Sequence, residues 1–264
     1  MTITNPDELS SMNYPLAKPR YYFSLAHELW QFIRQPKPER NLMKTTHLKI
    51  CDTIGLYLLK MVCLIPLVLF FAVVYDPENV QAGRMSDRFS PWMMVLVGGF
   101  ILPLVEEIAF RLSLRFKPIY LAMSAAVFTY YILTKLVFFT KISAVDDSFS
   151  LRILISMATG AVILLIVNFA PVKRLVVQFW ERHFRLIYYL SCIVFAWIHI
   201  AKYELILLNV LLVPILTLPQ LMSAVINGYT RVAFGFQYPL IFHISNNLIG
   251  IGLTLLSAND VSFY

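Results

Sequence analysis

The feature that most constrains this chain is a series of long apolar segments. Each is about 20 residues long, enough to cross the hydrocarbon core of a bilayer as a helix. Charged residues make up only 14% of the chain, against roughly a quarter in soluble domains, and 59% of the residues are hydrophobic. A soluble fold needs more polar surface than this, so the sequence predicts an all-α, polytopic membrane protein. The segments cover residues 54–75, 91–116, 119–140, 151–170, 186–203 and 236–257.

One further stretch, residues 204–234, does not fit this scheme simply. It is long for one span and short for two, and Pro214 and Pro219 interrupt it. We expect either one kinked span or two short helices there. The transmembrane helical bundle would then have seven or eight spans.

The first 49 residues are polar, except for a set of apolar residues that recur at helical spacing. It predicts an amphipathic helix that ends near Pro36 and Pro38 and lies either in the membrane interface or on the protein's own cytoplasmic face. The organisation that follows is a cytoplasmic N-terminal segment, 1–49, and a transmembrane domain, 50–264. The apolar positions at helical spacing are Tyr22, Leu25, Ala26, Leu29 and Ile33.

The basic residues indicate an orientation. With a cytoplasmic N-terminus and seven spans, fifteen of the 22 Lys and Arg residues fall on the inner side and five on the outer side. This excess follows the positive-inside rule, so we expect a multi-pass protein of the plasma (inner) membrane. The net charge of +7 is spread between the apolar spans, which disfavours nucleic acid as a partner.

Two adjacent glutamates lie inside the second apolar segment, where an ionisable group is costly and usually functional. Glu107 and Arg111 are four residues apart, so they share a helix face and can neutralise each other. Glu106 is rotated by about 100° from Glu107, which leaves it available for chemistry. The alternative is a purely structural salt-bridge network.

Two more polar clusters lie in later spans. His199 follows Phe195 by one helical turn, and His243 precedes Asn247 by one turn. Taken alone, His199 could be an ordinary core histidine, and His243 with Asn247 could be an interhelical hydrogen-bonding pair. Together with a glutamate they form a hydrolytic set: a general base for water, a proton-sharing imidazole, and donors for an oxyanion.

At these residues the sequence resembles the CPBP intramembrane proteases, which include the CaaX prenyl proteases of the Ras-converting-enzyme type and bacteriocin-processing or immunity proteins. The family pattern is Glu-Glu-x-x-x-Arg, then Phe-x-x-x-His, then His-x-x-x-Asn. All three motifs occur here in that order, at residues 106–111, 195–199 and 243–247. The resemblance covers residues 91–257.

The resemblance implies a glutamate-dependent peptidase that cleaves a membrane-associated peptide, prenylated or of the bacteriocin or leader type. Glu106 and His199 would activate water, and His243 and Asn247 would stabilise the oxyanion. Glu107 and Arg111 would form the supporting pair. No cofactor follows firmly. Members have also been described as metal-dependent, and zinc would then be held by Glu106, His199 and His243.

The chain departs from the family pattern at three points. Leu112 and Ser223 stand where members often have glycine, and Glu106 and His199 are separated by 93 residues, more than is usual. The additional chain is consistent with two extra spans. Because two is an even number, the helix of His199 still starts on the side where the helix of Glu106 ends. These departures concern substrate recognition more than the chemistry.

Two other functions remain open. The same motifs could stabilise a non-catalytic membrane immunity or interaction protein. A transporter is the third possibility, since Lys60 and Lys135 lie inside spans and could mark an ion path, although no inverted repeat is visible.

Overall fold

The computed structural model describes residues 15–39, 41, 43–75, 77–80, 85 and 87–260, with side chains described up to residue 256. It is 81% helical, and the described part of the chain contains no strand. The prediction of an all-α fold is therefore confirmed. Residues 1–14, Arg40 and Leu42 of the predicted N-terminal segment lie outside the described residues.

In the described part of the chain, six helical segments are long and apolar enough to cross a membrane, and each contains most of one of the six predicted segments. The agreement supports a multi-pass membrane protein. The segments are α3 (Thr46–Val73), Pro91–Leu114 (α5, Pro91–Met93; η2, Met94–Ile101; α6, Leu102–Phe110; η3, Leu112–Leu114), Pro118–Val137 (α7, Pro118–Ile132; η4, Leu133–Val137), α8 (Phe149–Asn168), Ala170–Lys202 (α9, Ala170–Ile198; η5, His199–Lys202) and Gln237–Leu256 of α13 (Gln237–Asp260).

The stretch 204–234 folds into three shorter helices: α10 (Leu207–Leu211), α11 (Val213–Leu216) and α12 (Leu218–Ala233). Pro214 and Pro219 lie in the first turns of α11 and α12. Proline is tolerated there because the amide it lacks would have no partner inside the helix. The prolines thus begin helices rather than kink one. A seventh or eighth span stays a prediction.

The chain divides into two compact units. Unit 1 comprises Met1–Met85 and Cys192–His243, and unit 2 comprises Ser86–Ser191 and Ile244–Tyr264. The helices α9 and α13 therefore each have residues in both units. The predicted division into an N-terminal segment, 1–49, and a membrane domain, 50–264, is a different partition of the chain and stays a prediction.

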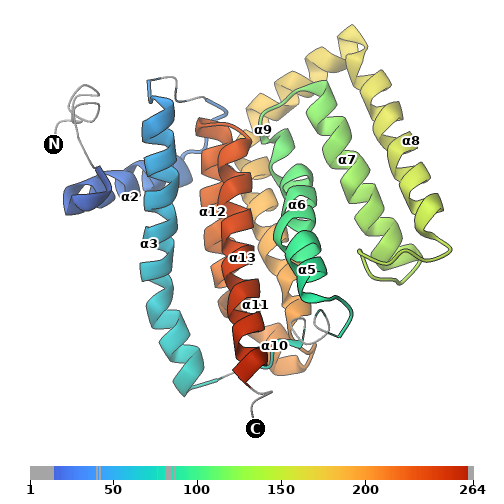
Figure 1. Cartoon of the computed structure of the whole chain (residues 1–264). Helices are drawn as coiled ribbons and strands as arrows, with labels where there is room; N and C mark the ends of the chain where they lie inside the picture. Colours follow the sequence, from blue (N-terminus) through green and yellow to red (C-terminus); the bar gives the residue numbers. More distant parts are fainter. Residues whose placement is uncertain are drawn as a thin grey trace. The chain divides into compact units, whose positions relative to one another are not determined.

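In unit 1, the helix α2 (Pro19–Arg34) follows a short 3₁₀ turn, η1 (Pro15–Ala17), and packs on α3 and α12. Figure 1 shows α2 lying across α3. Its buried face includes Tyr21 and Leu25, and Gly55 of α3 lets them approach, since a Cβ there would lie 2.8 Å from Leu25 Cδ2. The helix α2 covers the residues with helical periodicity, and one of its faces packs on α3 and α12. Its location at the membrane interface stays a prediction.

A polar network ties α2 to α3 and α12. The ammonium of Lys44 is paired with the carboxylates of Glu28 and Asp52, the latter at 2.7 Å. Tyr21 donates to Asp52, and Tyr229 of α12 donates to Glu28. Burial, followed by the charge of Asp52, raises the pKa of Tyr21. Burial opposes the charge of Lys44, but the two carboxylates outweigh it and raise the pKa of Lys44.

In unit 2, α7 and α8 form a closely packed pair, visible side by side in Figure 1. Gly160 makes the approach possible, because a Cβ at that position would lie 3.0 Å from the Cβ of Ala126. The helix α6 also packs on α7, and Ser124 of α7 donates a hydrogen bond of 2.7 Å to the carbonyl of Ile108 in α6. The helix α7 therefore supports the segment that bears the glutamates, and α8 packs on α7.

Candidate functional site

The glutamates follow an unusual stretch of helix. Residues Met94–Ile101 form a π-helix, η2, and α6 begins directly after it at Leu102. A π-helical turn changes the direction in which the following side chains point, and such turns are frequent at functional sites. Gly98 and Gly99 lie within it and are buried. The adjacent glycines are the only hint of this turn in the sequence.

Glu107 and Arg111 form an ion pair inside unit 2. The distance between Arg111 Nη1 and Glu107 Oε1 is 3.6 Å, and both side chains are completely buried. Arg111 is the C-terminal cap residue of α6, and its guanidinium also lies 5.7 Å from the centroid of the Phe110 ring. A buried charge pair of this kind is strongly destabilised when one partner is removed, because the other charge remains.

Glu106, one residue earlier, has a different environment. Its side chain is half-buried, whereas that of Glu107 is fully buried. Glu106 interacts electrostatically with Tyr131 of α7, a residue that the sequence analysis did not single out. On the same helix, the carbonyl of Phe110 accepts a hydrogen bond of 2.5 Å from Ser191 Oγ. The backbone that carries the two glutamates is thus held from two sides.

Asn247 lies in the part of α13 that belongs to unit 2. Its Nδ2 donates a hydrogen bond of 3.0 Å to the carbonyl of Gly98 in the π-helix. The helices η2 and α13 approach closely here, because a Cβ on Gly99 would lie 2.6 Å from Leu248 Cδ2. The contact fixes the amide of Asn247 and uses one of its two N–H bonds.

In unit 1, His199 is the first residue of η5, at the end of α9. Its Nδ1 lies 2.7 Å from the carbonyl oxygen of Phe195. Since a carbonyl only accepts, Nδ1 carries the proton, and in the neutral imidazole the lone pair is on Nε2. This tautomer suits a general base or a metal ligand.

His243, like His199, lies in unit 1. The ring centroids of Phe195 and His199 are 4.7 Å apart, and those of Phe195 and His243 are 5.8 Å apart at 83°. The two histidines therefore share one buried phenylalanine. His243 itself is 7% exposed, as expected for a residue of a packed helix rather than of a surface.

The six predicted residues are divided between the two units. Glu106, Glu107, Arg111 and Asn247 lie in unit 2, and His199 and His243 lie in unit 1. Among the described residues, no cluster of three or more His, Cys, Asp or Glu side chains is arranged to hold a metal ion. The zinc alternative therefore has no cluster to support it and stays a prediction.

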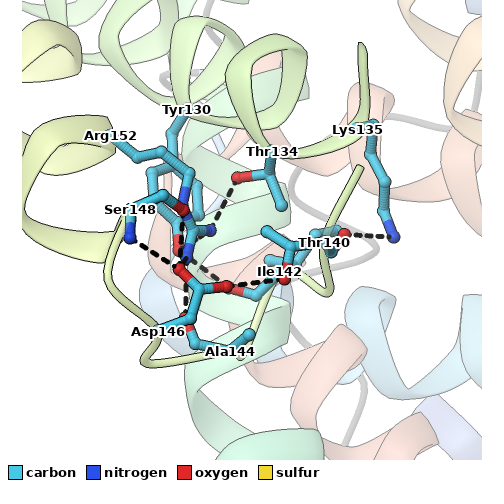
Figure 2. Close-up of polar contacts among 9 residues, drawn as sticks. All are labelled: Tyr130, Thr134, Lys135, Thr140, Ile142, Ala144, Asp146, Ser148 and Arg152. Atoms are coloured by element: carbon cyan, nitrogen blue, oxygen red, sulfur yellow. Dashed lines mark hydrogen bonds and ion pairs between the residues drawn. The ribbon is translucent and has the colours of Figure 1, made fainter. Parts of the chain in front are cut away.

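The sequence analysis missed a buried arginine. Arg152, one of the five basic residues counted on the outer side, lies in the first turn of α8 and is completely buried. Figure 2 shows its guanidinium surrounded by the loop between α7 and α8. The charge of Arg152 faces Asp146, whose Oδ1 is 3.1 Å from Nη2. The remaining acceptors are Tyr130 Oη, Thr134 Oγ1, the carbonyl of Ala144 and Ser148 Oγ, at 2.8–3.1 Å.

The carboxylate of Asp146 is exposed, but its neighbours stabilise its negative charge. Hydrogen bonds from Ser148 and Thr140, and then the charge of Arg152, lower the pKa of Asp146 to about 2. The signal in the sequence was the spacing of Tyr130 in α7 and Thr134 in η4, four residues apart, followed by Asp146 and Arg152. The acceptors around the Arg152 guanidinium form a polar cage. Along the chain, this cage is far from the three motifs.

Comparison with known proteins adds no relative. No protein-family profile, curated protein or solved structure matches the chain. Function is therefore inferred from the residues and their geometry.

Proposed function

We propose that this protein is a glutamate-dependent intramembrane peptidase of the CPBP type. It would hydrolyse a peptide bond of a membrane-associated peptide with an activated water molecule. One observation carries the proposal most directly: the two adjacent glutamates occupy different environments. Glu107 is fully buried in an ion pair with Arg111, whereas the carboxylate of Glu106 is half-buried. A purely structural salt bridge needs only Glu107 and Arg111. It gives no reason for a second acid at position 106.

The first step assigned to this set is the activation of water. Glu106 accepts a proton from the water, and the oxygen of the water forms a bond with the carbonyl carbon of the peptide. His199 shares this proton through Nε2, since its Nδ1 donates to the carbonyl of Phe195. When the C–N bond breaks, the proton goes to the leaving amine. The products are a carboxylate and an amine.

The second task is stabilisation of the oxyanion. His243 and Asn247 are assigned as its hydrogen-bond donors. The hydrogen bond from Asn247 Nδ2 to Gly98 supports this role, because it orients the amide and leaves the second N–H of the same nitrogen for a ligand.

The membrane arrangement is part of the proposal. The N-terminus would be cytoplasmic, in the plasma (inner) membrane, with seven or eight spans. The helix α2 would lie at the interface, with its buried face on α3 and α12. Phe23 and Trp30 on its other side are 77% and 58% exposed, which suits contact with lipid headgroups.

No cofactor is assigned. If zinc takes part, Glu106, His199 and His243 would be its ligands, and bound zinc would polarise the water and the carbonyl group. The donor types fit zinc, and the hydrogen bond from His199 Nδ1 to a backbone carbonyl is the usual second contact of a ligating histidine.

The test is cleavage of a pool of membrane-anchored and prenylated peptides by the purified, reconstituted protein, read by mass spectrometry. We expect cleavage by the wild type and by Tyr229→Phe, a control variant that loses one hydrogen bond to Glu28. Glu106→Gln should abolish cleavage while the protein remains folded. Full activity of Glu106→Gln would refute the assignment, and loss of activity on chelation would identify a metal.

A non-catalytic membrane immunity or interaction protein is the second candidate. The observation that favours it is that Glu107, His199 and Asn247 each have a contact inside their own unit, as structural residues would. A cellular rescue assay separates the two functions. Full rescue by Glu106→Ala would favour the non-catalytic function, and failure of a well-folded variant would favour the peptidase.

A further inference from the structure

Three exposed basic side chains meet at the loop between α7 and α8 in unit 2. Nη1 of Arg88, which precedes α5, donates a hydrogen bond of 3.4 Å to Ser143 Oγ. Nζ of Lys135, in η4, donates one of 3.2 Å to the carbonyl of Thr140 (Figure 2). Lys141 lies between these two acceptors in the sequence. Arg88, Lys135 and Lys141 therefore form one cation cluster, although the first comes from a distant part of the chain.

The cation cluster has no acidic partner in the part of the chain that the structure describes. The charges of Arg88 and Lys141 both act on Lys135, and none of the three is in an ion pair with a described carboxylate. Asp146, the acid nearest to the cluster in the loop, faces Arg152 instead. Like charges repel, so an anion at this turn would stabilise the cluster. Two further acids of these loops are exposed and pair with none of the three cations: Asp87 and Asp147.

The loop that carries the cluster is held by its own contacts. Thr140 Oγ1 donates a hydrogen bond of 2.7 Å to Asp146 Oδ2, and the buried Arg152 donates one of 2.8 Å to the carbonyl of Ala144. Phe139 has a φ of 48°, in the left-handed region that a bulky residue rarely adopts. Such a backbone conformation persists only where the surrounding structure enforces it. The positions of the cations are therefore built into the fold.

The cluster lies where two candidate membrane spans end and begin. Lys135 is two residues before the end of the span Pro118–Val137, about 3 Å along the helix axis, and Arg88 is three residues before the span that starts at Pro91. In a multi-pass membrane protein, these positions are at the boundary between the hydrocarbon core and the headgroups. Three apolar side chains next to the cations are 54% to 82% exposed: Leu136, Val137 and Phe139.

These surroundings select the chemistry of the anion. Lysine binds phosphate as a point charge, and the planar guanidinium of arginine can bind two phosphate oxygens. Exposed apolar side chains beside the cations favour a phosphate that carries acyl chains. The headgroup of phosphatidylcholine also bears a quaternary ammonium, which three cations repel, whereas that of phosphatidylglycerol has a net negative charge.

We propose that the cation cluster binds the phosphate of an anionic phospholipid. The acyl chains would lie along the exposed apolar residues of η4 and of the loop. Such a contact would fix this end of the α7–α8 pair at the membrane surface. The site contains no residue of the three motifs, so it is independent of the peptidase chemistry.

The experiment uses the full-length protein in nanodiscs of phosphatidylcholine, with Phe139→Trp as a fluorescent reporter in the loop. Increasing mole fractions of acyl-brominated phosphatidylglycerol or acyl-brominated phosphatidylcholine are added, and the emission of the protein without the reporter is subtracted. The preference is the ratio of the two mole fractions that give half-maximal quenching. We expect a preference above about 25-fold for the anionic lipid, the effect of at least two of the three cations at about fivefold each.

Variants in the reporter protein give the matched controls. Lys141→Gln should lower the preference about fivefold, and Lys141→Arg should keep it. The described residues give the ammonium of Lys141 no hydrogen bond, so its loss changes the lipid site and not the fold of the loop. Lys37→Gln removes the same charge from an exposed position in unit 1 and should keep the preference. Equal quenching by both lipids, or equal losses in Lys141→Gln and Lys37→Gln, would overturn the proposal.

A second reporter decides the matter if Phe139→Trp does not give a monodisperse protein. Trp92 is 84% exposed at the start of α5, four residues after Arg88, and Trp92→Phe supplies its blank. The same preference and the same losses are expected from this position.

Two other anions are tested as competitors. Inorganic phosphate, compared with chloride at equal ionic strength, should leave the preference unchanged, because the acyl chains hold the lipid at the loop. Loss of the preference in phosphate would assign the site to a free phosphate ion. A soluble glutamate-rich peptide that changes the reporter emission, while both lipids quench equally, would assign the site to an acidic protein partner. Either result would contradict the proposed lipid.

Discussion

Replacing Arg152 with methionine tests the polar cage between α7 and α8. The guanidinium is completely buried and donates to five acceptors, four of them in residues 130–146 and one on Ser148 (Figure 2). Methionine has a similar reach and no donor, so Arg152→Met removes these contacts without leaving a large cavity. We expect the loop between the two helices to open while the helices themselves remain.

The size of the effect follows from the buried acceptors. A hydrogen bond from a charged donor contributes about 1.5–3 kcal/mol, and the contributions of one network do not add. Counting only the acceptors on Tyr130, Thr134 and Ala144, and leaving out the exposed Asp146, we expect a loss of about 3 kcal/mol of local stability. This corresponds to a roughly hundredfold faster opening-limited exchange of the loop amides.

Hydrogen exchange read by mass spectrometry measures this directly. The informative amides are those of Thr140, Ala144 and Phe149, which have backbone partners within the loop or at its ends. Lys141→Met is the matched control, because it removes an exposed cation from the same loop and should change little. If Arg152→Met exchanged no faster than the control, the cage would not stabilise the loop and the reasoning would be refuted.

Three further predictions concern other groups. Because the pKa of Asp146 is lowered to about 2, the protection of the loop should be constant above about pH 4 and fall as the pH drops toward 2, with a flat profile in Asp146→Asn. Glu107→Gln should lower the free energy of unfolding by about 3–5 kcal/mol, because it removes the negative charge that faces the buried guanidinium of Arg111, and a much smaller loss would contradict the ion pair. Gly99→Ala should destabilise the protein by about 1–3 kcal/mol through its clash with Leu248, whereas Gly252→Ala, which has open space, should be neutral or stabilise it by up to about 1 kcal/mol in the same melting experiment.

The membrane-spanning helices could be predicted from sequence because the length of an apolar run is a local property. Their ends could not, because polar contacts from elsewhere extend them. The helix α3 begins at Thr46, eight residues before the apolar run that starts at residue 54. Thr45 caps it, because its side-chain hydroxyl accepts a hydrogen bond from the amide of Leu48. Asp52 is tolerated in the added turns because Lys44 and Tyr21 hold it. Such partners are invisible to a hydropathy pattern.

The candidate site was predictable to the extent that its contacts lie on one helix. The pairing of Glu107 with Arg111 follows from a spacing of four residues. The contact of Asn247 with Gly98 joins residues 149 positions apart, and the surroundings of Arg152 depend on how a loop folds back. No period in the sequence links Asn247 to Gly98 or Arg152 to the loop carbonyl of Ala144. The motif resemblance named the residues to examine but not the groups that fix their orientation.

These orienting contacts also show which substitutions separate catalysis from structure. Glu107, His199 and Asn247 each use one polar atom in a contact that a structural role would explain equally well. Removing the whole side chain therefore destroys both functions at once. The atoms that report on catalysis are those outside these orienting contacts: Nε2 of His199 and the other N–H of Asn247. A variant that keeps the orienting contact and changes the second atom measures the chemistry alone, and Glu106→Gln, which changes a carboxylate into an amide of nearly the same shape, is the simplest of this kind.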